Sequence, residues 1–292
     1  MAAPRVRSKP DIATVFGLAI AAACILGGLI LEGGHISDIA QLTAAFIVLG
    51  VTLGAVMVST PLATLKGAMK RFRHVLLDRD LSPELLIDEI VGYASKARKN
   101  GLVSLEKDVE QISDPFLHKA VSLAVDGADL QEIRGMMQLQ IDIEEQHGLA
   151  EARVVESAGG YSPTIGIIGA VLGLIQVMKN LANIEEVGHG IAVAFVATVY
   201  GVGLANIVLL PAANKMKARV RQETQRKELV VEGVAGIVEG LNPKLIRCKL
   251  EAYYLNDIAP TPATPDGAPT KEDAEVGARA QKPRAAAVRS AI

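Results

Sequence analysis

The polar side chains inside the most apolar parts of this sequence carry hydroxyl or amide groups and no formal charge. Four windows contain no Asp, Glu, Lys or Arg: residues 12–31, 39–65, 157–178 and 190–214. An ion that crosses hydrocarbon needs a titratable or coordinating group near the middle of the bilayer. If this protein conducts ions, a partner chain must supply a carboxylate, and this chain supplies only the walls of the path. The polar side chains in the windows include Thr14, Gln41, Thr43, Thr52, Tyr161, Ser162, Thr164, Gln176, Thr198, Tyr200 and Asn206.

Each charge-free window is long enough to cross a membrane. The chain of 292 residues is 50% apolar and has no Trp, and its mean hydropathy is +0.31. A helix needs about 20 apolar residues to cross a hydrocarbon core of roughly 30 Å. We therefore expect an all-α fold: a four-span helical membrane protein with a helical cytoplasmic domain between spans 2 and 3 and a cytoplasmic C-terminal helix.

Basic residues flank the windows unevenly. Arg5, Arg7 and Lys9 precede the first window, whereas the short connections at residues 32–38 and 183–188 contain no Lys or Arg. Positive residues favour the cytoplasmic side of a membrane. We therefore expect a multi-pass protein of the bacterial inner membrane, with both termini in the cytoplasm. The basic residues after the second and fourth windows are Lys66, Lys70, Arg71, Arg73, Lys215, Lys217, Arg219 and Arg221.

The charged segments are expected to form helices in the cytoplasm. Ser82 followed by Pro83 is typical of a helix start, and Asp129 followed by Glu132 is a capping pattern that opens a helix running on into span 3. After residue 258 the sequence has almost no large apolar side chains, which predicts disorder. The predicted domains are residues 1–65 with spans 1 and 2, 66–156 in the cytoplasm, 157–214 with spans 3 and 4, 215–258 as cytoplasmic C-terminal helices, and 259–292 as a disordered tail.

Spans 3 and 4 carry small residues on one face and a proline each. Pro163 begins span 3 and Pro211 ends span 4. A proline in lipid frees a carbonyl that needs a new partner, so it can mark a hinge or a polar path, although Pro211 could simply lie at a helix end. Small faces admit a partner helix or serve ordinary packing within the bundle. They comprise Gly166, Gly169 and Gly173 in span 3, and Ala194, Thr198, Gly201 and Ala205 in span 4.

Other classes of function are disfavoured. The net charge of −2 argues against a nucleic-acid binder. Cys24 and Cys248 are interpreted as packing residues, since two distant cysteines make neither a disulfide framework nor a metal site. The spans have no catalytic His, carboxylate or metal cluster, so we expect neither an enzyme nor a bound cofactor.

Two runs of sequence resemble the third and fourth spans of MotA-type stator proteins of the flagellar motor. They are AGGYSPTIGIIGAVLGLIQVM from residue 158 and GIAVAFVATVYG from residue 190, and the resemblance covers about residues 10–258. It implies a ring of five subunits around a dimer of MotB-type subunits whose membrane Asp carries the ion. The ion-path and partner-facing residues that it implies are Pro163, Thr164, Gly166, Ala170, Ala197, Thr198, Tyr200 and Pro211.

The same resemblance extends to a cytoplasmic hairpin. Arg98 and Glu106 match the charges that in this family face the rotor switch protein FliG. The residues alone favour another interpretation, in which Arg98 at a helix C-terminus and Glu106 in a first turn stabilise the helix dipoles.

The coupling ion is expected to be the proton. Sodium needs several oxygen ligands at short range. Sodium-type relatives such as PomA have hydroxyls at the two positions that are Ala170 and Ala197 here. The proton is therefore expected rather than sodium.

Two alternatives remain open. An ExbB- or TolQ-like proton channel that energises outer-membrane processes resembles the chain but typically has three spans. A secondary transporter would show repeated spans and intramembrane charges.

Overall fold

The computed structural model describes residues 8–75, 77–79 and 83–258. Within them, four helices are long and apolar enough to cross a membrane: α1 (Ile12–Leu31), α3 (Leu42–Ser59), α8 (Leu130–Lys179) and the continuous helix Ile184–Val238. The predicted all-α, four-span fold is confirmed. The tail that we predicted at residues 259–292 lies outside the described residues.

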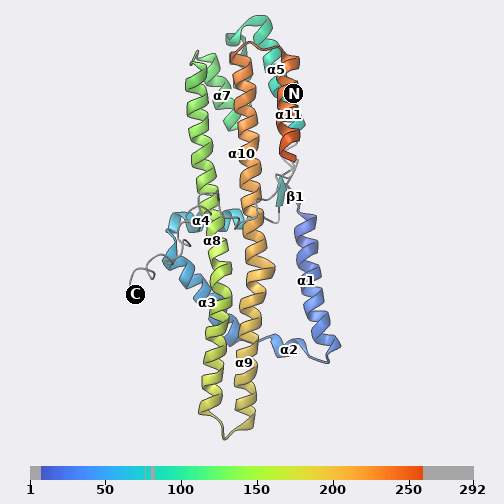
Figure 1. Ribbon diagram of the computed structural model, residues 1–292, viewed down its shortest axis with the longest axis vertical. Helices are drawn as coiled ribbons and strands as arrows, with labels where there is room; N and C mark the ends of the chain where they lie inside the picture. The colour runs from blue at the N-terminus through green and yellow to red at the C-terminus, as the bar shows by residue number, and fades with distance from the viewer. Residues whose placement is uncertain (1–7, 76, 80–82, 259–292) are drawn as a thin grey trace, which may run out of the picture. The chain divides into compact units, whose positions relative to one another are not determined.

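Two long antiparallel helices form the centre of the fold (Figure 1). α8 has 50 residues and is about 75 Å long at 1.5 Å per residue. The chain turns at residues 180–183 and returns through α9 (Ile184–Gly203), a π-helical turn η2 (Leu204–Leu209) and α10 (Leu210–Val238). The side chain of Asp129 caps α8 and that of Asn183 caps α9. Spans 3 and 4 thus continue without a break into the charged part of the protein.

The second charge-free window does not form one helix. α3 ends at Ser59, and Thr60 and Pro61 have extended backbone before α4 (Leu62–His74) begins. Proline lacks an N–H and forces the preceding residue out of the helical region, so the chain changes direction here. The remaining helices are α2 (Ile36–Ile39), α5 (Pro83–Asn100), the 3₁₀ helix η1 (Leu102–Leu105), α6 (Glu106–Val109), α7 (Pro115–Val125) and α11 (Pro243–Ile258).

A short antiparallel ribbon adds to the helical fold. β1 (Ser8–Pro10) pairs with β2 (Leu77–Arg79) and joins the segment before α1 to the segment after α4. Each strand has three residues, which is too short to show the alternating apolar pattern that predicts a strand.

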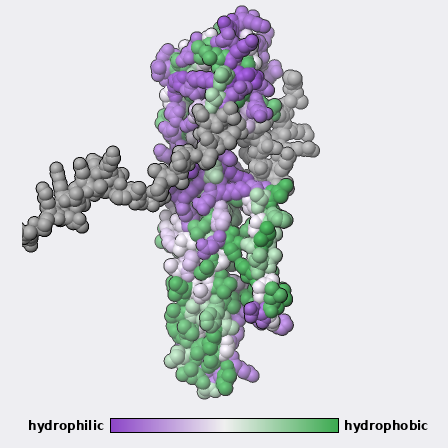
Figure 2. Space-filling view, turned by 45° about the vertical axis from the view of Figure 1, so that its right-hand side comes forward, coloured by the Kyte–Doolittle hydropathy of each residue, from purple (hydrophilic) through white to green (hydrophobic). Residues whose placement is uncertain are grey.

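Apolar side chains cover the outside of the spans and fill the inside of the charged part. Figure 2 shows hydrophobic residues gathered around the spans and hydrophilic residues around the rest. Phe16 on α1 and Phe46 on α3 are 66% and 79% exposed, and no residue of α1 is buried. Because water would oppose such exposure, these surfaces face lipid or other chains.

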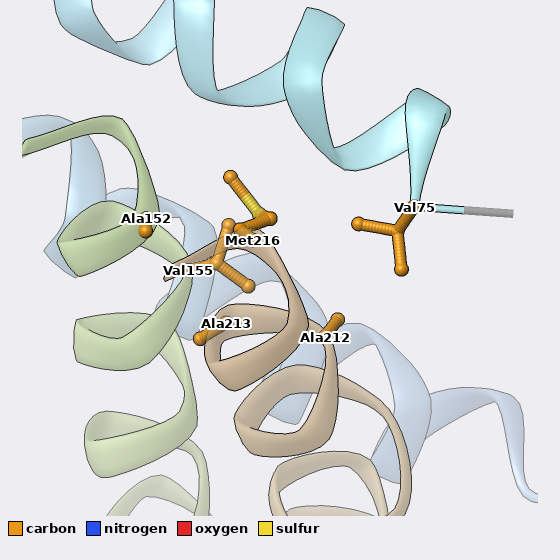
Figure 3. Packing of buried hydrophobic residues seen from close by; sticks show 6 residues of the cluster. All are labelled: Val75, Ala152, Val155, Ala212, Ala213 and Met216. Carbon is orange, nitrogen blue, oxygen red and sulfur yellow. The ribbon is translucent and has the colours of Figure 1, made fainter. Parts of the chain in front are cut away.

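A small apolar core joins α4, α8 and α10 where the spans end. Figure 3 shows Met216 of α10 between α8 and the end of α4. Four of the six buried residues are alanine or valine of α8 and α10, and such small side chains allow close packing of the helices. The cluster comprises Val75, Ala152, Val155, Ala212, Ala213 and Met216.

Candidate functional site

Glycines bring α8 and α9 into backbone contact. A Cβ atom on Gly166 would lie 2.9 Å from the Ala197 carbonyl oxygen, and one on Gly201 would lie 2.7 Å from the Ser162 carbonyl oxygen. The buried Ser162 hydroxyl donates a hydrogen bond to the Gly201 carbonyl oxygen at 2.9 Å. A Cβ on Gly173 would meet the α9 backbone at 2.8 Å. The small faces predicted from the sequence are therefore occupied by packing within one chain.

The predicted path residues differ in their accessibility. Gly166 and Ala197 are buried between the two helices, and Thr164 and Pro211 are exposed. The others, which are half-buried, are Pro163, Ala170, Thr198 and Tyr200. The structure brings Gly166, Ala197 and Thr198 together, because the Gly166 Cβ position lies 3.4 Å from the Thr198 Cα.

The two threonine hydroxyls donate to their own helices. Thr164 Oγ1 donates to the Tyr161 carbonyl oxygen at 2.8 Å, and Thr198 Oγ1 donates to the Ala194 carbonyl oxygen at 3.2 Å. Each hydroxyl oxygen can still accept a hydrogen bond. Both can therefore receive a proton donor, such as water or a protonated carboxyl group.

Tyr200 contacts α2 and α3. Its hydroxyl donates to the Ile39 carbonyl oxygen at 2.5 Å, and its ring packs on the cluster of Ala44, Val48, Val196 and Ala197. Tyr200 thus fastens α9 to the chain at the start of α3.

Pro211 does not end a helix, because α10 runs on through it to Val238. Its ring would clash with the carbonyl four residues earlier, at Ile207, and it has no N–H to offer. The π-helical turn at Leu204–Leu209 ends two residues before Pro211 and accommodates this misfit. Pro163 lies inside α8, which also continues without interruption.

The hairpin that carries Arg98 and Glu106 is exposed. Arg98 lies in the last turn of α5, and Glu106 starts α6 after the tight turn at Gly101, whose φ is 83°. Lys96 and Asp108 form a salt bridge of 2.5 Å that ties the two sides together. Val103, between the two charges in sequence, is 68% exposed. Arg98 and Glu106 are also exposed, so another protein can reach their charges.

One buried polar atom belongs to Thr52, which the sequence offered only as one of the polar side chains in the charge-free windows. The Thr52 hydroxyl on α3 is buried and has no hydrogen-bond partner within the described part of the chain. Its sequence context is that of any apolar window, so only packing identifies it. No group of three His, Cys, Asp or Glu side chains that could hold a metal occurs among the described residues.

Comparisons with known proteins agree with this architecture. The profile of the MotA/TolQ/ExbB proton channel family matches residues 108–229, and that of the motility protein A N-terminal region matches residues 15–100. Motility protein A of Bacillus subtilis is 35% identical over 244 residues, which are 83% of this chain and 90% of the relative.

Two solved structures are similar to this chain. The structure of C. jejuni MotAB has a TM-score of 0.80 and 32% identity, covering 83% of this chain and 95% of the other. The flagellar MotAB stator complex from Bacillus subtilis has a TM-score of 0.78 and 34% identity, covering 85% of this chain and 100% of the other. Since fold, length and sequence all agree, this chain belongs to the MotA/TolQ/ExbB proton channel family, with motility protein A among its relatives.

Proposed function

We propose that this chain is a stator subunit of a bacterial flagellar motor. It forms an ion channel with a MotB-type partner and converts ion flow into torque on the rotor. The observation that carries this proposal is the absence of charged side chains in residues 157–178 and 190–214 of a chain that belongs to a proton channel family. A carboxylate within the membrane must therefore come from the partner.

The proposed assembly has five copies of this chain around a partner dimer in the inner membrane. Both termini and the charged helices lie in the cytoplasm. The basic residues that follow α3 and begin the charged part of α10 support this orientation, whereas the connections at residues 32–38 and 183–188 have none.

The proposed ion path runs beside α8 and α9. Thr164 and Thr198 supply hydroxyl oxygens to this path. Pro163 and Pro211 mark the positions where the two helices change conformation. Protonation of the partner's Asp removes its charge and weakens its preference for the polar side of the ring, so the ring can step to the next subunit. One elementary charge moving through 100 mV supplies about 2.3 kcal/mol, so a step must be nearly strain-free or also use the chemical gradient.

The proposed coupling ion is the proton. Ala170 and Ala197 offer no side-chain oxygen, which leaves Thr198 nearly alone as a side-chain oxygen ligand for sodium. Swimming speed in medium with sodium replaced by potassium tests this. Unchanged speed is expected, and arrest would assign the channel to sodium.

The proposed rotor contact is the exposed hairpin, with Arg98 and Glu106 pairing with charges of the rotor switch protein FliG. Charge reversal by Arg98→Glu or Glu106→Lys should reduce swimming. The matched controls are Lys99→Glu and Glu110→Lys, which reverse neighbouring exposed charges. Equal losses in the controls would show a general effect of charge.

The central test is dependence on the partner. The chain, expressed in a bacterium that lacks its own stator genes, should restore swimming only together with a MotB-type subunit that has its membrane Asp. Purified chain reconstituted alone should conduct no cations. Conductance by the chain alone would overturn the proposal, because the carboxylate would then be unnecessary.

A further inference from the structure

The helix α4 lies where the spans meet the charged helices. It follows span 2 after the break at Thr60 and Pro61, and it runs across the direction of α8 (Figure 1). A Cβ on Gly67 would meet the Glu151 side chain, and Ala68 packs with Val56 and Val154. These contacts place α4 beside the last residues of α8 before its charge-free window begins at residue 157. α4 therefore lies at the membrane boundary.

The two sides of α4 differ in what they contact. The inner side packs on α8: Ala68 is buried, and Arg71 forms salt bridges with Glu151 at 2.7 Å and with Glu223 at 3.3 Å. Burial lowers the pKa of Arg71, but the two carboxylates outweigh it and hold the pKa above its usual value. The positive charge of Arg71 is thus neutralised by two carboxylates of the same chain.

The outer side carries apolar and basic residues that this chain leaves uncovered. Leu62 and Met69 are 64% and 56% exposed, and Lys66, Lys70 and Arg73 are also exposed. At 3.6 residues per turn these five side chains fall within an arc of about 100°. The three cations have no ion pair within the described part of the chain, whereas nearby Lys215 and Lys217 on α10 pair with Asp11 and Glu156.

We propose that the outer side of α4 is a binding site for an anionic phospholipid of the adjacent leaflet. Lys66, Lys70 and Arg73 contact the headgroup phosphate, and Leu62 and Met69 contact the acyl chains. Interleaved basic and apolar residues on a helix at the membrane boundary fit a lipid, which presents a negative group directly above hydrocarbon. In the orientation proposed above, this is the cytoplasmic leaflet.

The test measures binding of fluorescently labelled phosphatidylglycerol to the full chain in a neutral detergent. Unlabelled phosphatidylglycerol should displace the probe, whereas phosphatidylcholine and soluble glycerol phosphate at the same concentration should not. Each basic residue near a lipid surface contributes about fivefold in affinity. The triple variant Lys66→Gln, Lys70→Gln, Arg73→Gln should therefore weaken binding by at least tenfold, and Met69→Gln by severalfold.

The matched control removes the same charge elsewhere. The triple variant Lys99→Gln, Lys107→Gln, Lys244→Gln changes three exposed lysines of the charged helices and should leave binding unchanged. Equal weakening in both triple variants would overturn the proposal, as would displacement by phosphatidylcholine, which would show a non-selective apolar face. Displacement by glycerol phosphate would show a site for free anions.

The wild-type chain provides a test that does not depend on folding of the triple variant. Its preference for phosphatidylglycerol over phosphatidylcholine should fall as salt is raised, since salt screens contacts with exposed cations. A preference that salt leaves unchanged would contradict binding through Lys66, Lys70 and Arg73.

Discussion

The contact between Gly201 and the α8 backbone gives a sharp prediction. A Cβ added to Gly201 would lie 2.7 Å from the Ser162 carbonyl oxygen and 2.9 Å from the Gly166 Cα. Ordinary contacts between carbon atoms are about 3.5–4.0 Å. Both neighbours are backbone atoms, so α8 as a whole must move away in the variant Gly201→Ala.

The size of the effect follows from two terms. Overpacking of this kind costs about 1–3 kcal/mol. Separation of the helices also weakens the hydrogen bond from the Ser162 hydroxyl to the Gly201 carbonyl oxygen, which is worth about 1 kcal/mol. Alanine gains about 1 kcal/mol over glycine in a helix. The net destabilisation of Gly201→Ala is therefore about 1–3 kcal/mol.

A control two residues away isolates the contact. Gly203 ends α9 with helical backbone angles, and a Cβ there would meet nothing within 4 Å. Gly203→Ala brings the same gain in helix propensity as Gly201→Ala but no steric clash, so it should leave the stability unchanged or raise it. The difference between the two variants is then about 2–4 kcal/mol, or on the order of 5–10 °C in melting temperature.

The measurement is thermal unfolding of the full chain in a mild detergent, followed by far-ultraviolet circular dichroism. Gly166→Ala, whose Cβ would lie 2.9 Å from the Ala197 carbonyl oxygen, should melt early like Gly201→Ala and reports the same contact from α8. If Gly201→Ala and Gly203→Ala melt together, the two helices are not in backbone contact and the packing described above is wrong.

Three further predictions concern other contacts. Tyr200→Phe removes the hydrogen bond to the end of α2 and should cost about 1 kcal/mol in thermal unfolding, whereas Tyr161→Phe should not. The hydrogen bond from Lys215 holds the pKa of Asp11 below its usual value of 3.8. The stability from this pair is therefore present above pH 3.8 and lost as the pH falls through the lowered pKa, so Asp11→Asn should melt earlier than wild type at neutral pH and equally in strong acid. Pro211→Ala removes the cause of the π-helical turn and should reduce swimming severalfold while the melting temperature stays within a few degrees.

Charge and hydropathy were sufficient to predict the spans. The window at residues 12–31 coincides with α1, because charged residues are excluded from the bilayer core. The union of span 3 with the charged helix that precedes it was predicted from the capping residue Asp129, and α8 confirms one continuous helix. Both predictions depend on residues that are close together in the sequence, so one sequence is enough to make them.

Contacts between distant residues were not predictable in the same way. Residues 39–65 were predicted as one span, because charge and hydropathy carry no information on the break in the helix at Pro61. The presence of Pro211 does not by itself say whether the helix ends, kinks or forms a π-helical turn, so the turn at Leu204–Leu209 was not predicted. The hydrogen bond of Tyr200 to Ile39 joins residues that are far apart in sequence and meet only through packing.

The packing of α8 on α9 limits where a partner helix can bind. The glycine face that sequence reasoning offered to a partner is filled by α9, and Gly166 and Ala197 are buried there. Of the threonines among the predicted path residues, Thr164 is exposed and Thr198 is half-buried. Thr198 lies at the height of Gly166, which is two residues or about 3 Å along α8 from Thr164. The two hydroxyl oxygens therefore lie at about the same depth, but Thr164 and Gly166 point about 200° apart around α8, so the hydroxyls face different sides of that helix. No acidic or basic side chain in residues 157–178 or 190–214 competes with a partner's carboxylate at this depth.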